Sequence, residues 1–226
     1  MNEIAAKEKI LLFWSGGKDS ALALHYLKKN PAVEIVGLVT IFDREKNTVA
    51  FHGIPDSLVI DQAKMLKLPL QRIFLPSDCT DAEYVENVRK ILAMFAKKGI
   101  RSVAFGDTNQ QEIRKFREEM LVPLEMKALF PLWGKNSIDI SREFLNTGHK
   151  ALVTSINEKK LDHSFLAVEF DQSWLERLPK NIDPAGEDGA FHTFVTYGPN
   201  FKMRVAFSKA IARNEGPYLV SLVKEP

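Results

Sequence analysis

Residues 15–20, SGGKDS, directly follow the apolar run ILLFW at residues 10–14 and open a segment with helical spacing. A buried strand, a glycine turn and a helix start therefore succeed one another. Two glycines let backbone N–H groups approach an anion, and the helix N-terminus directs its unpaired N–H groups to the same place. Lys18 adds a positive charge, and Ser15 and Ser20 add hydroxyl groups. The stretch predicts a phosphate-binding loop.

The loop matches neither of two familiar phosphate-binding patterns, because G-x-x-x-x-G-K-[ST] and G-x-G-x-x-G are both absent from it. Asp19 can cap the helix, or it can be an outer ligand of a metal ion carried by the phosphates. The alternative interpretation is an ordinary glycine turn between a strand and a helix. The two interpretations differ in what replacement of Lys18 does, since only the first predicts a loss of nucleotide binding.

Length and composition describe a globular protein. The chain has 226 residues, of which 45% are hydrophobic, so it can build one large domain or two modest ones. The formal net charge of +2 is too small to argue for a nucleic-acid partner. Cys79 is the single cysteine, which excludes an internal disulfide and favours a cytoplasmic location. No apolar stretch approaches the ~20 residues that span a bilayer, and residues 1–9 do not resemble a signal peptide.

The first half alternates between strand and helix patterns. Buried strands separated by helices of this length imply a parallel sheet with right-handed crossovers. Ligands of such sheets bind outside the carboxyl ends of the strands, where residues 15–20, the pair Val39 and Thr40, and the pair Gly106 and Asp107 fall. The predicted strands are residues 10–14, 34–40, 70–75 and 102–105, and the predicted helices are residues 19–29, 56–68, 81–98 and 110–120.

The alternation breaks near Val122, and residues 129–134, LFPLWG, form an aromatic, proline-containing connector. The second half predicts a helix at 141–147, strands at 150–156, 191–196 and 218–223, and a weaker strand at 203–207. The expected fold class is α/β, with a parallel-sheet N-terminal domain of residues 1–125. A smaller α+β domain of residues 126–226 follows it.

A second constellation lies at residues 183–193, DPAGEDGAFHT, directly before a predicted strand. It holds three carboxylates, one histidine and two glycines. Carboxylates beside a histidine can bind a cationic group, bind a metal or move protons. The alternative is a solvated turn whose acids only cap the chain and keep it soluble.

The two motifs together resemble a known family. Residues 15–20 resemble the PP-loop, SGGxDS, of the N-type ATP pyrophosphatases, and residues 186–194 resemble the GENGEFHTF segment of the diphthine–ammonia ligase family. Residues 51–55 (FHGIP), 105–107 (FGD) and 129–134 (LFPLWG) look like the bacterial branch of that family. The resemblance covers nearly the full chain. Two positions depart from it, because Asp188 replaces the usual Asn and Ala190 replaces the usual second Glu.

The resemblance implies an HUP-like (adenine nucleotide alpha hydrolase-like) fold and an ATP-dependent, AMP-forming ligase. In that chemistry a carboxylate attacks the α-phosphate of ATP, pyrophosphate leaves, and ammonia then displaces AMP. The cofactors implied are ATP and Mg²⁺. The residue assignments implied are Ser15, Gly16, Gly17, Lys18 and Ser20 for the phosphates, Asp19 for the metal, Val39 and Thr40 for adenine, Gly106 and Asp107 beside the same pocket, and Lys18, Asp19, Glu187 and His192 for catalysis, with His192 as proton shuttle.

Three functions compete for this sequence: the ligase, a nucleotide-binding protein of the same fold without turnover, and a PP-loop enzyme that modifies tRNA. The near-neutral charge and the absence of cysteine pairs argue against the third. The acceptor of a ligase is open between a small carboxylate and a modified protein side chain. The oligomeric state is open too, with a homodimer through an edge strand or the C-terminal part as one arrangement.

Several other polar residues are expected to have structural or surface roles rather than functional ones. His25 is expected at the surface or in the core, His52 is expected to bond the backbone, and His149 is expected to cap a helix end. Arg114 and Arg117 are expected on a solvated helix face, with phosphate contact as the alternative because their helix begins at the ligand edge of the sheet.

Overall fold

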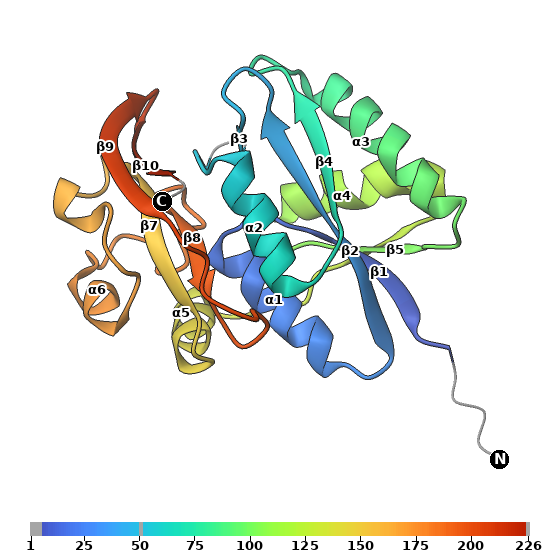
Figure 1. Ribbon diagram of the computed structural model, residues 1–226, viewed down its shortest axis with the longest axis horizontal. Helices are drawn as coiled ribbons and strands as arrows, with labels where there is room; N and C mark the ends of the chain where they lie inside the picture. Colours follow the sequence, from blue (N-terminus) through green and yellow to red (C-terminus); the bar gives the residue numbers. More distant parts are fainter. Residues whose placement is uncertain (1–5, 50–51, 225–226) are drawn as a thin grey trace.

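The computed structural model describes residues 6–49 and 52–224, which form two sheets with helices packed around them (Figure 1). The first sheet contains β1 (Glu8–Phe13), β2 (Val33–Asp43), β3 (Thr48–Val49), β4 (Leu70–Leu75), β5 (Ser102–Ala104) and β6 (Lys127–Leu129). Its helices are α1 (Lys18–Lys29), α2 (Asp56–Leu66), α3 (Asp81–Ala96) and α4 (Gln111–Leu121), and the 3-10 turn η1 (Val122–Leu124) follows α4.

The strands of the first sheet are parallel except for β3, which pairs antiparallel with the end of β2. The chain runs from β1 to β2 and β4 on one side, then crosses to β5 and β6 on the other side of β1. The strand order therefore reverses between β1 and its neighbour β5. A reversal of this kind leaves a crevice at the carboxyl ends of the two strands, which is where open α/β sheets bind ligands.

Helices cover both faces of the first sheet. α1 and α2 lie on the face that looks toward the second sheet, and α3 and α4 lie on the opposite face (Figure 1). The core is divided in the same way, because Leu22 and Leu58 belong to one cluster and Val88 and Met120 belong to another. Most residues of α1 are buried, as expected of a helix that packs against other elements on two sides.

The second sheet is antiparallel, with the order β8-β7-β10-β9. Its strands are β7 (Lys150–Asn157), β8 (Phe191–Tyr197), β9 (Ser208–Glu215) and β10 (Tyr218–Lys224), accompanied by α5 (Ser137–Asn146), the 3-10 turn η2 (His163–Phe165) and α6 (Gln172–Arg177). Phe144 and Val195 join the same core cluster as Leu22, so this sheet packs directly on α1. The fold is α/β with a smaller second part, as the sequence predicts.

Three predictions about the elements need correction. The expected strand at 203–207 is wrong, because the strand begins at Ser208; the backbone N–H of Lys202 instead bonds the Met65 carbonyl of α2, and that of Val205 bonds Thr196. The predicted connector at 129–134 overlaps the short strand β6, which the sequence pattern does not predict. The second strand, β2, continues to Asp43 rather than ending at Thr40. In the last two cases the missed residues pair with β5 and with β4, which extends strand structure past the predicted bounds.

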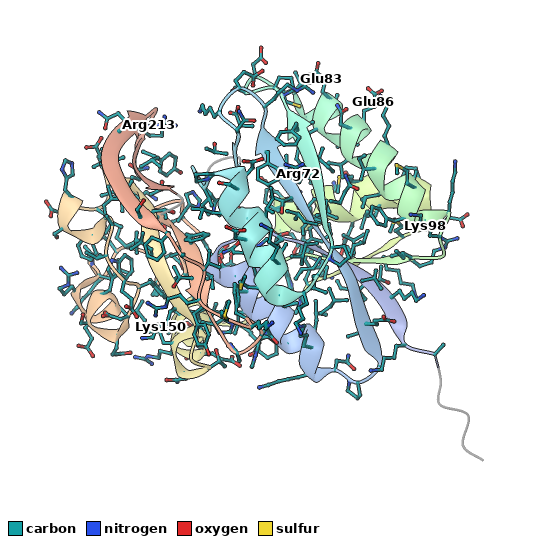
Figure 2. All side chains as sticks on the ribbon, viewed as in Figure 1. Arg72, Glu83, Glu86, Lys98, Lys150 and Arg213 are labelled. Atoms are coloured by element: carbon teal, nitrogen blue, oxygen red, sulfur yellow. The ribbon has the colours of Figure 1, made fainter. Side chains whose placement is uncertain are left out.

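The division expected at residue 125 remains a prediction. Because β6 pairs with β5 in the first sheet, we propose that the boundary falls after Leu129. Charged side chains such as Glu86 and Lys98 project outward around α3 (Figure 2). None of the helices in the described residues has the length and apolar character needed to cross a membrane.

Candidate functional site

The glycine loop, residues 15–20, turns sharply from β1 into α1. Gly16 has a φ of +82°, a conformation that favours glycine, and Gly17 is the N-cap of α1. The Ser15 hydroxyl accepts the Gly17 N–H at 3.2 Å, and the Ser20 hydroxyl donates to the Gly17 carbonyl at 2.9 Å. Within residues 6–49 and 52–224, the N–H groups of Asp19 and Ser20 find no acceptor. The first turn of α1 therefore keeps donors for an anion.

Lys18 is buried at the centre of the site, with only 3% of its surface exposed. Its ammonium forms an ion pair with Asp19 at 2.8 Å and donates a hydrogen bond to the Ala185 carbonyl. The same ammonium lies 5.5 Å from the centre of the Phe191 ring. Lys18 thus joins the glycine loop to the part of the chain that carries the second motif.

Strand β8 holds the glycine loop from the other side. The backbone N–H of Lys18 donates to the Thr193 hydroxyl at 3.0 Å, and the N–H of Val195 donates to the Gly16 carbonyl at 2.8 Å. A Cβ on Gly17 would lie 3.1 Å from the Thr193 carbonyl oxygen. The loop is therefore shaped by residues about 175 positions away in the sequence.

Local sequence pattern gives no role to Thr193, although the residue lies inside the second motif. It also misses Gln62 of α2, whose amide bonds both Gly16 and Val195. A signal for Gln62 exists in the sequence. It lies four residues after Leu58 and four before Leu66, so a polar side chain falls on the buried face of an amphipathic helix.

The end of β5 packs against the first turn of α1. A Cβ on Gly106 would lie 3.1 Å from both the Asp19 carbonyl carbon and the Ser20 nitrogen, so the missing side chain permits this approach. Burial raises the pKa of Asp107, the Asp19 charge raises it further, and the Arg117 guanidinium opposes the rise. The structure therefore brings Gly106 and Asp107, which follow β5, close to the glycine loop.

Arg117 is the half-buried partner of Asp107, with 3.5 Å between Nε and the carboxylate. It donates to the Tyr84 hydroxyl at 2.7 Å and lies 5.1 Å from the Phe105 ring centre. The solvated-face interpretation is therefore wrong for Arg117. Arg114 is half-exposed, stacks 4.7 Å from the Trp133 ring centre and pairs with Glu118, so its charge is occupied within the helix.

The acidic turn, residues 183–189, uses two of its carboxylates to hold its own backbone. Asp183 accepts the N–H groups of Ala185 at 2.8 Å and Glu187 at 3.2 Å. Asp188 is exposed, caps the Ala190 N–H and pairs with Lys160 at 2.9 Å. The capping interpretation thus holds for these two acids. Ala190 is fully buried in the core.

Glu187 is the acid of this turn that faces the glycine loop. Its backbone carbonyl accepts a hydrogen bond from Gln110 at 2.9 Å, which ties it to the start of α4. Burial raises the pKa of Glu187 to about 7, with the Asp19 charge as the next cause and the Lys18 charge opposing it. Near neutral pH this carboxyl group can hold or release a proton.

His192 lies against His52, with 4.4 Å between the ring centres and the rings tilted by 43°, and it lies 5.6 Å from the Tyr218 ring centre. Burial, followed by the Lys18 charge, lowers the pKa of His192 to about 4. Burial lowers the pKa of His52 in the same way, and its buried Nδ1 has no hydrogen-bond partner in the described chain. Both rings are neutral at pH 7. Local sequence pattern does not predict that His52 lies beside His192. Phe51 of the same segment lies outside the described residues.

Val39 and Thr40 are less open than expected. The Val39 carbonyl accepts the Trp14 N–H at 2.8 Å, and the Thr40 hydroxyl donates to the Trp14 carbonyl at 2.6 Å. Both side chains are buried inside β2 rather than at its end. Pairing of β2 with β1 ends at Val39, and β2 continues past the end of β1 from Thr40 onward.

A magnesium ion bound with a nucleotide needs one or two protein carboxylates besides phosphate oxygens. Asp19 fits that requirement, although Lys18 now occupies its carboxylate. Across the described ranges, no group of three or more His, Cys, Asp or Glu side chains is arranged to hold a metal without such help.

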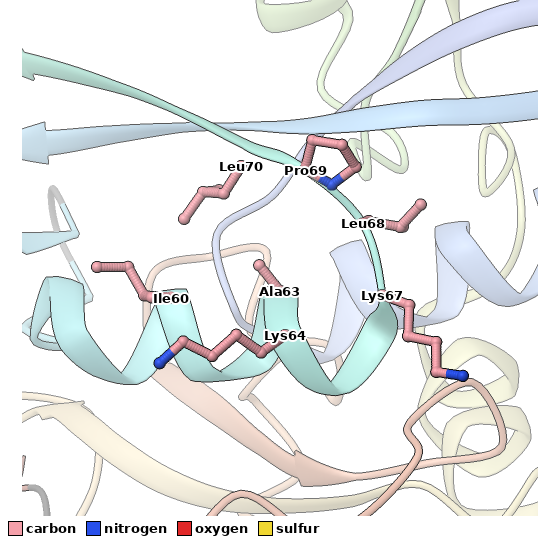
Figure 3. A pocket seen from close by; sticks show the side chains of 7 residues that line it. All are labelled: Ile60, Ala63, Lys64, Lys67, Leu68, Pro69 and Leu70. Carbon is pink, nitrogen blue, oxygen red and sulfur yellow. The ribbon is translucent and has the colours of Figure 1, made fainter.

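A surface hollow of about 380 Å³ lies between the end of α2 and the start of β4 (Figure 3). It is lined by Ile60, Ala63, Lys64, Lys67, Leu68, Pro69 and Leu70. This is the amino end of β4, at the edge of the sheet opposite the glycine loop. The hollow is therefore separate from the candidate site.

The strand order, the glycine loop at the reversal and the acidic turn against it define a nucleotide-binding protein of the PP-loop class. Comparison with family models gives the family. Residues 8–128 match the diphthamide synthase N-terminal domain, and residues 136–216 match the diphthamide synthase C-terminal domain. The chain belongs to the diphthamide synthase family. Family membership supports an ATP-using enzyme of the PP-loop type.

No curated protein matches the chain. Among solved structures, a similar chain is a predicted subunit of tRNA methyltransferase from Methanocaldococcus jannaschii. The two share 19% sequence identity over 63% of this chain and 77% of that chain, with a TM-score of 0.42. This likeness is too distant to bear on function.

Proposed function

We propose that the protein is an ATP-dependent, AMP-forming ligase similar to diphthine–ammonia ligase. A carboxylate oxygen of the acceptor attacks the α-phosphorus of ATP, the bond to the bridging oxygen breaks, and pyrophosphate leaves. The lone pair of ammonia then attacks the acyl carbon, AMP departs, and the nitrogen loses a proton to leave an amide.

One observation carries the proposal: the buried ammonium of Lys18 touches both motifs, through Asp19 on one side and the Ala185 carbonyl on the other. A phosphate-binding loop alone fits many nucleotide-binding proteins. A ligase must also bring an acceptor to the α-phosphate, and the acidic turn lies directly beside the loop. Proximity of two substrates is a large part of what such an enzyme supplies.

In this proposal the glycine loop neutralises the charge that develops on the departing pyrophosphate. The free N–H groups of Asp19 and Ser20 and the ammonium of Lys18 are the donors, and Ser15, Gly16 and Gly17 shape the loop. Phosphate oxygens replace the Asp19 carboxylate as counter-charge of Lys18, which leaves Asp19 for the magnesium ion. Backbone near Val39 and Thr40 contacts adenine, and Gly106 and Asp107 border the nucleotide.

Glu187 and His192 face the acceptor in this proposal. With its pKa lowered to about 4, His192 is a neutral imidazole at pH 7 and can only accept a proton. With its pKa raised to about 7, Glu187 can do both. We therefore assign the proton relay to Glu187, with His192 beside it as a hydrogen-bonding group.

The test is a product analysis with ATP, Mg²⁺, ammonium and a panel of small carboxylates. We expect AMP and pyrophosphate in equal amounts, and Lys18→Ala should reduce their release about 10²-fold or more. Lys29→Ala removes an exposed charge from the other end of the same helix and should have no effect. ADP and phosphate as products would contradict the proposal.

Two other outcomes point to the competing functions. ATP that stays bound and uncleaved with every acceptor supports a nucleotide-binding protein without turnover, a reading favoured by the buried Ala190 where the family usually carries a glutamate. Salt-sensitive binding of tRNA supports a tRNA-modifying enzyme. The acceptor, a homodimeric state and a cytoplasmic location remain predictions from the sequence.

A further inference from the structure

Gln62 presents a buried and fully bonded amide behind the glycine loop. Its side chain is completely buried in α2. Oε1 accepts the indole N–H of Trp14 at 2.8 Å, and Nε2 donates to the carbonyls of Gly16 at 3.0 Å and Val195 at 2.7 Å. An indole only donates and a carbonyl only accepts, so these partners fix which end of the amide carries the oxygen.

The amide controls the shape of the loop at Gly16. The Gly16 carbonyl receives two hydrogen bonds, one from Gln62 and one from the Val195 N–H at 2.8 Å. Both lone pairs of that oxygen are used, so the peptide plane between Gly16 and Gly17 cannot rotate freely. A Cβ on Gly16 would lie 2.7 Å from Gln62 Oε1, which shows how closely the glycine and the amide fit.

A purely structural role is a poor explanation for an amide here. The position lies on the apolar face of α2 between Leu58 and Leu66, where a leucine or methionine would fill similar volume. Burying a polar side chain costs free energy that its hydrogen bonds only roughly offset. The bonds therefore contribute geometry more than stability.

We propose that Gln62 is a positioning residue of the nucleotide site: it holds the Gly16–Gly17 peptide so that the glycine loop can receive the outer phosphates of ATP, and it links that loop to β8. The inference rests on the proposed function and adds to it a residue that the motifs do not contain. Gln62 touches no substrate in this role; it acts through Gly16.

The experiment measures binding of ATP and of AMP, each with Mg²⁺, by calorimetry to wild type and Gln62→Met. Methionine keeps the volume and removes all three hydrogen bonds. We expect the dissociation constant for ATP to rise about tenfold or more, because a displaced loop misplaces the phosphate donors. The constant for AMP, which lacks the outer phosphates, should change less than about twofold.

Two further variants support the interpretation. Trp14→Phe removes the indole N–H that orients the amide, and with it one ring of a fully buried side chain, so its effect is taken from ATP binding relative to AMP binding. It should weaken ATP binding by a smaller factor than Gln62→Met. It decides the question if Gln62→Met does not fold. Arg89→Met is the matched control, because it removes two side-chain bonds to backbone carbonyls, those of Met120 and Glu119, far from the loop. It should leave ATP binding unchanged.

Folded variants that bind ATP as wild type does, or that lose ATP and AMP equally, would overturn the inference. Wild type that binds no ATP would overturn it together with the nucleotide site. Selective loss of ATP binding in a protein that never forms AMP would uphold the role of Gln62 and reject the ligase, so the two failures are distinguishable.

Discussion

The charged ammonium of Lys18 is almost fully shielded from water, and an adjacent counter-charge offsets the free-energy cost of burying it. A buried ammonium without a counter-ion costs several kcal/mol. Asp19 supplies the counter-charge, and its own side chain is 29% exposed. The carboxylate can therefore leave for solvent or a metal while Lys18 stays. A nucleotide that brings its own negative charge meets a lysine already in place.

Glu187 provides a prediction at the same scale. Because its pKa is raised to about 7, the ionised form that accepts a proton appears as the pH rises through neutrality. We expect AMP release, which follows the attack of ammonia and the loss of its proton, to increase between pH 6 and pH 8 with a midpoint near 7 when the concentration of free ammonia is held constant. Glu187→Gln should lower the rate about 10²-fold and remove that midpoint.

Glu176→Gln, which changes an exposed acid of α6, should keep the wild-type pH profile. A pH profile of Glu187→Gln with an unaltered midpoint would assign the titration to another group. Stopped assays that quantify AMP across the pH range, at a constant concentration of free ammonia, make the measurement.

At the scale of elements, the site exists because β1 and β5 are neighbours and their following turns meet. The chain after β5 can approach the first turn of α1 only where a side chain is missing, at Gly106. β8 approaches the same loop from the other side through Thr193 and Val195. The loop is therefore clamped between an element of each sheet.

Gly106→Ala tests this clamp. The added methyl group would lie 3.1 Å from Ser20 nitrogen, a backbone atom that cannot yield without moving the helix start. We expect ATP affinity to fall about tenfold while the protein stays folded. Gly37→Ala is the control, because the methyl there has contacts of 3.4 Å or more and lies within β2, away from the turn after β5. Equal ATP affinities in the two variants would contradict the clamp.

At the scale of the whole molecule, two buried histidines lie where α1 meets the second sheet. The rings of His25 and His149 are 5.7 Å apart, and both Nε2 atoms are buried without a partner in the described chain. His149 Nδ1 pairs with the Thr147 hydroxyl at 2.8 Å, near the end of α5 where a cap was expected. Burial lowers the pKa of both histidines, that of His149 to about 4.

This pair predicts loss of stability in acid. The folded state keeps His149 neutral, whereas the unfolded chain binds a proton at about pH 6.5. The stabilisation is therefore complete above pH 6.5 and is lost as the pH falls toward 4, by about 2 kcal/mol at pH 5. His149→Gln should reduce the fall in Tm between pH 7 and pH 5 by about 4–8 °C.

His163→Gln changes an exposed histidine and should leave that fall as it is in wild type. Thermal unfolding followed by circular dichroism at the two pH values makes the comparison. An identical fall in His149→Gln and wild type would place the acid sensitivity elsewhere, for example at His52 and His192.

The amino-acid sequence alone determined the parallel sheet, the helices between its strands and the glycine loop at a strand end. These features depend on local pattern: apolar runs such as residues 10–14, helical spacing, and two glycines before a helix. The family followed from the same two motifs. Local pattern also carried the acidic turn, although not which of its acids faces the loop.

Only the tertiary structure decided how the site is built. It showed that Glu187 faces the loop while Asp183 and Asp188 hold backbone. It also showed that the Arg117 guanidinium packs against Tyr84 and Phe105, and that Gln62 and Thr193 shape the glycine loop. None of this follows from local pattern, because each contact joins residues that are far apart along the chain. Their hydrogen bonds and pKa values depend on burial between two sheets, and burial exists only once both have packed on α1.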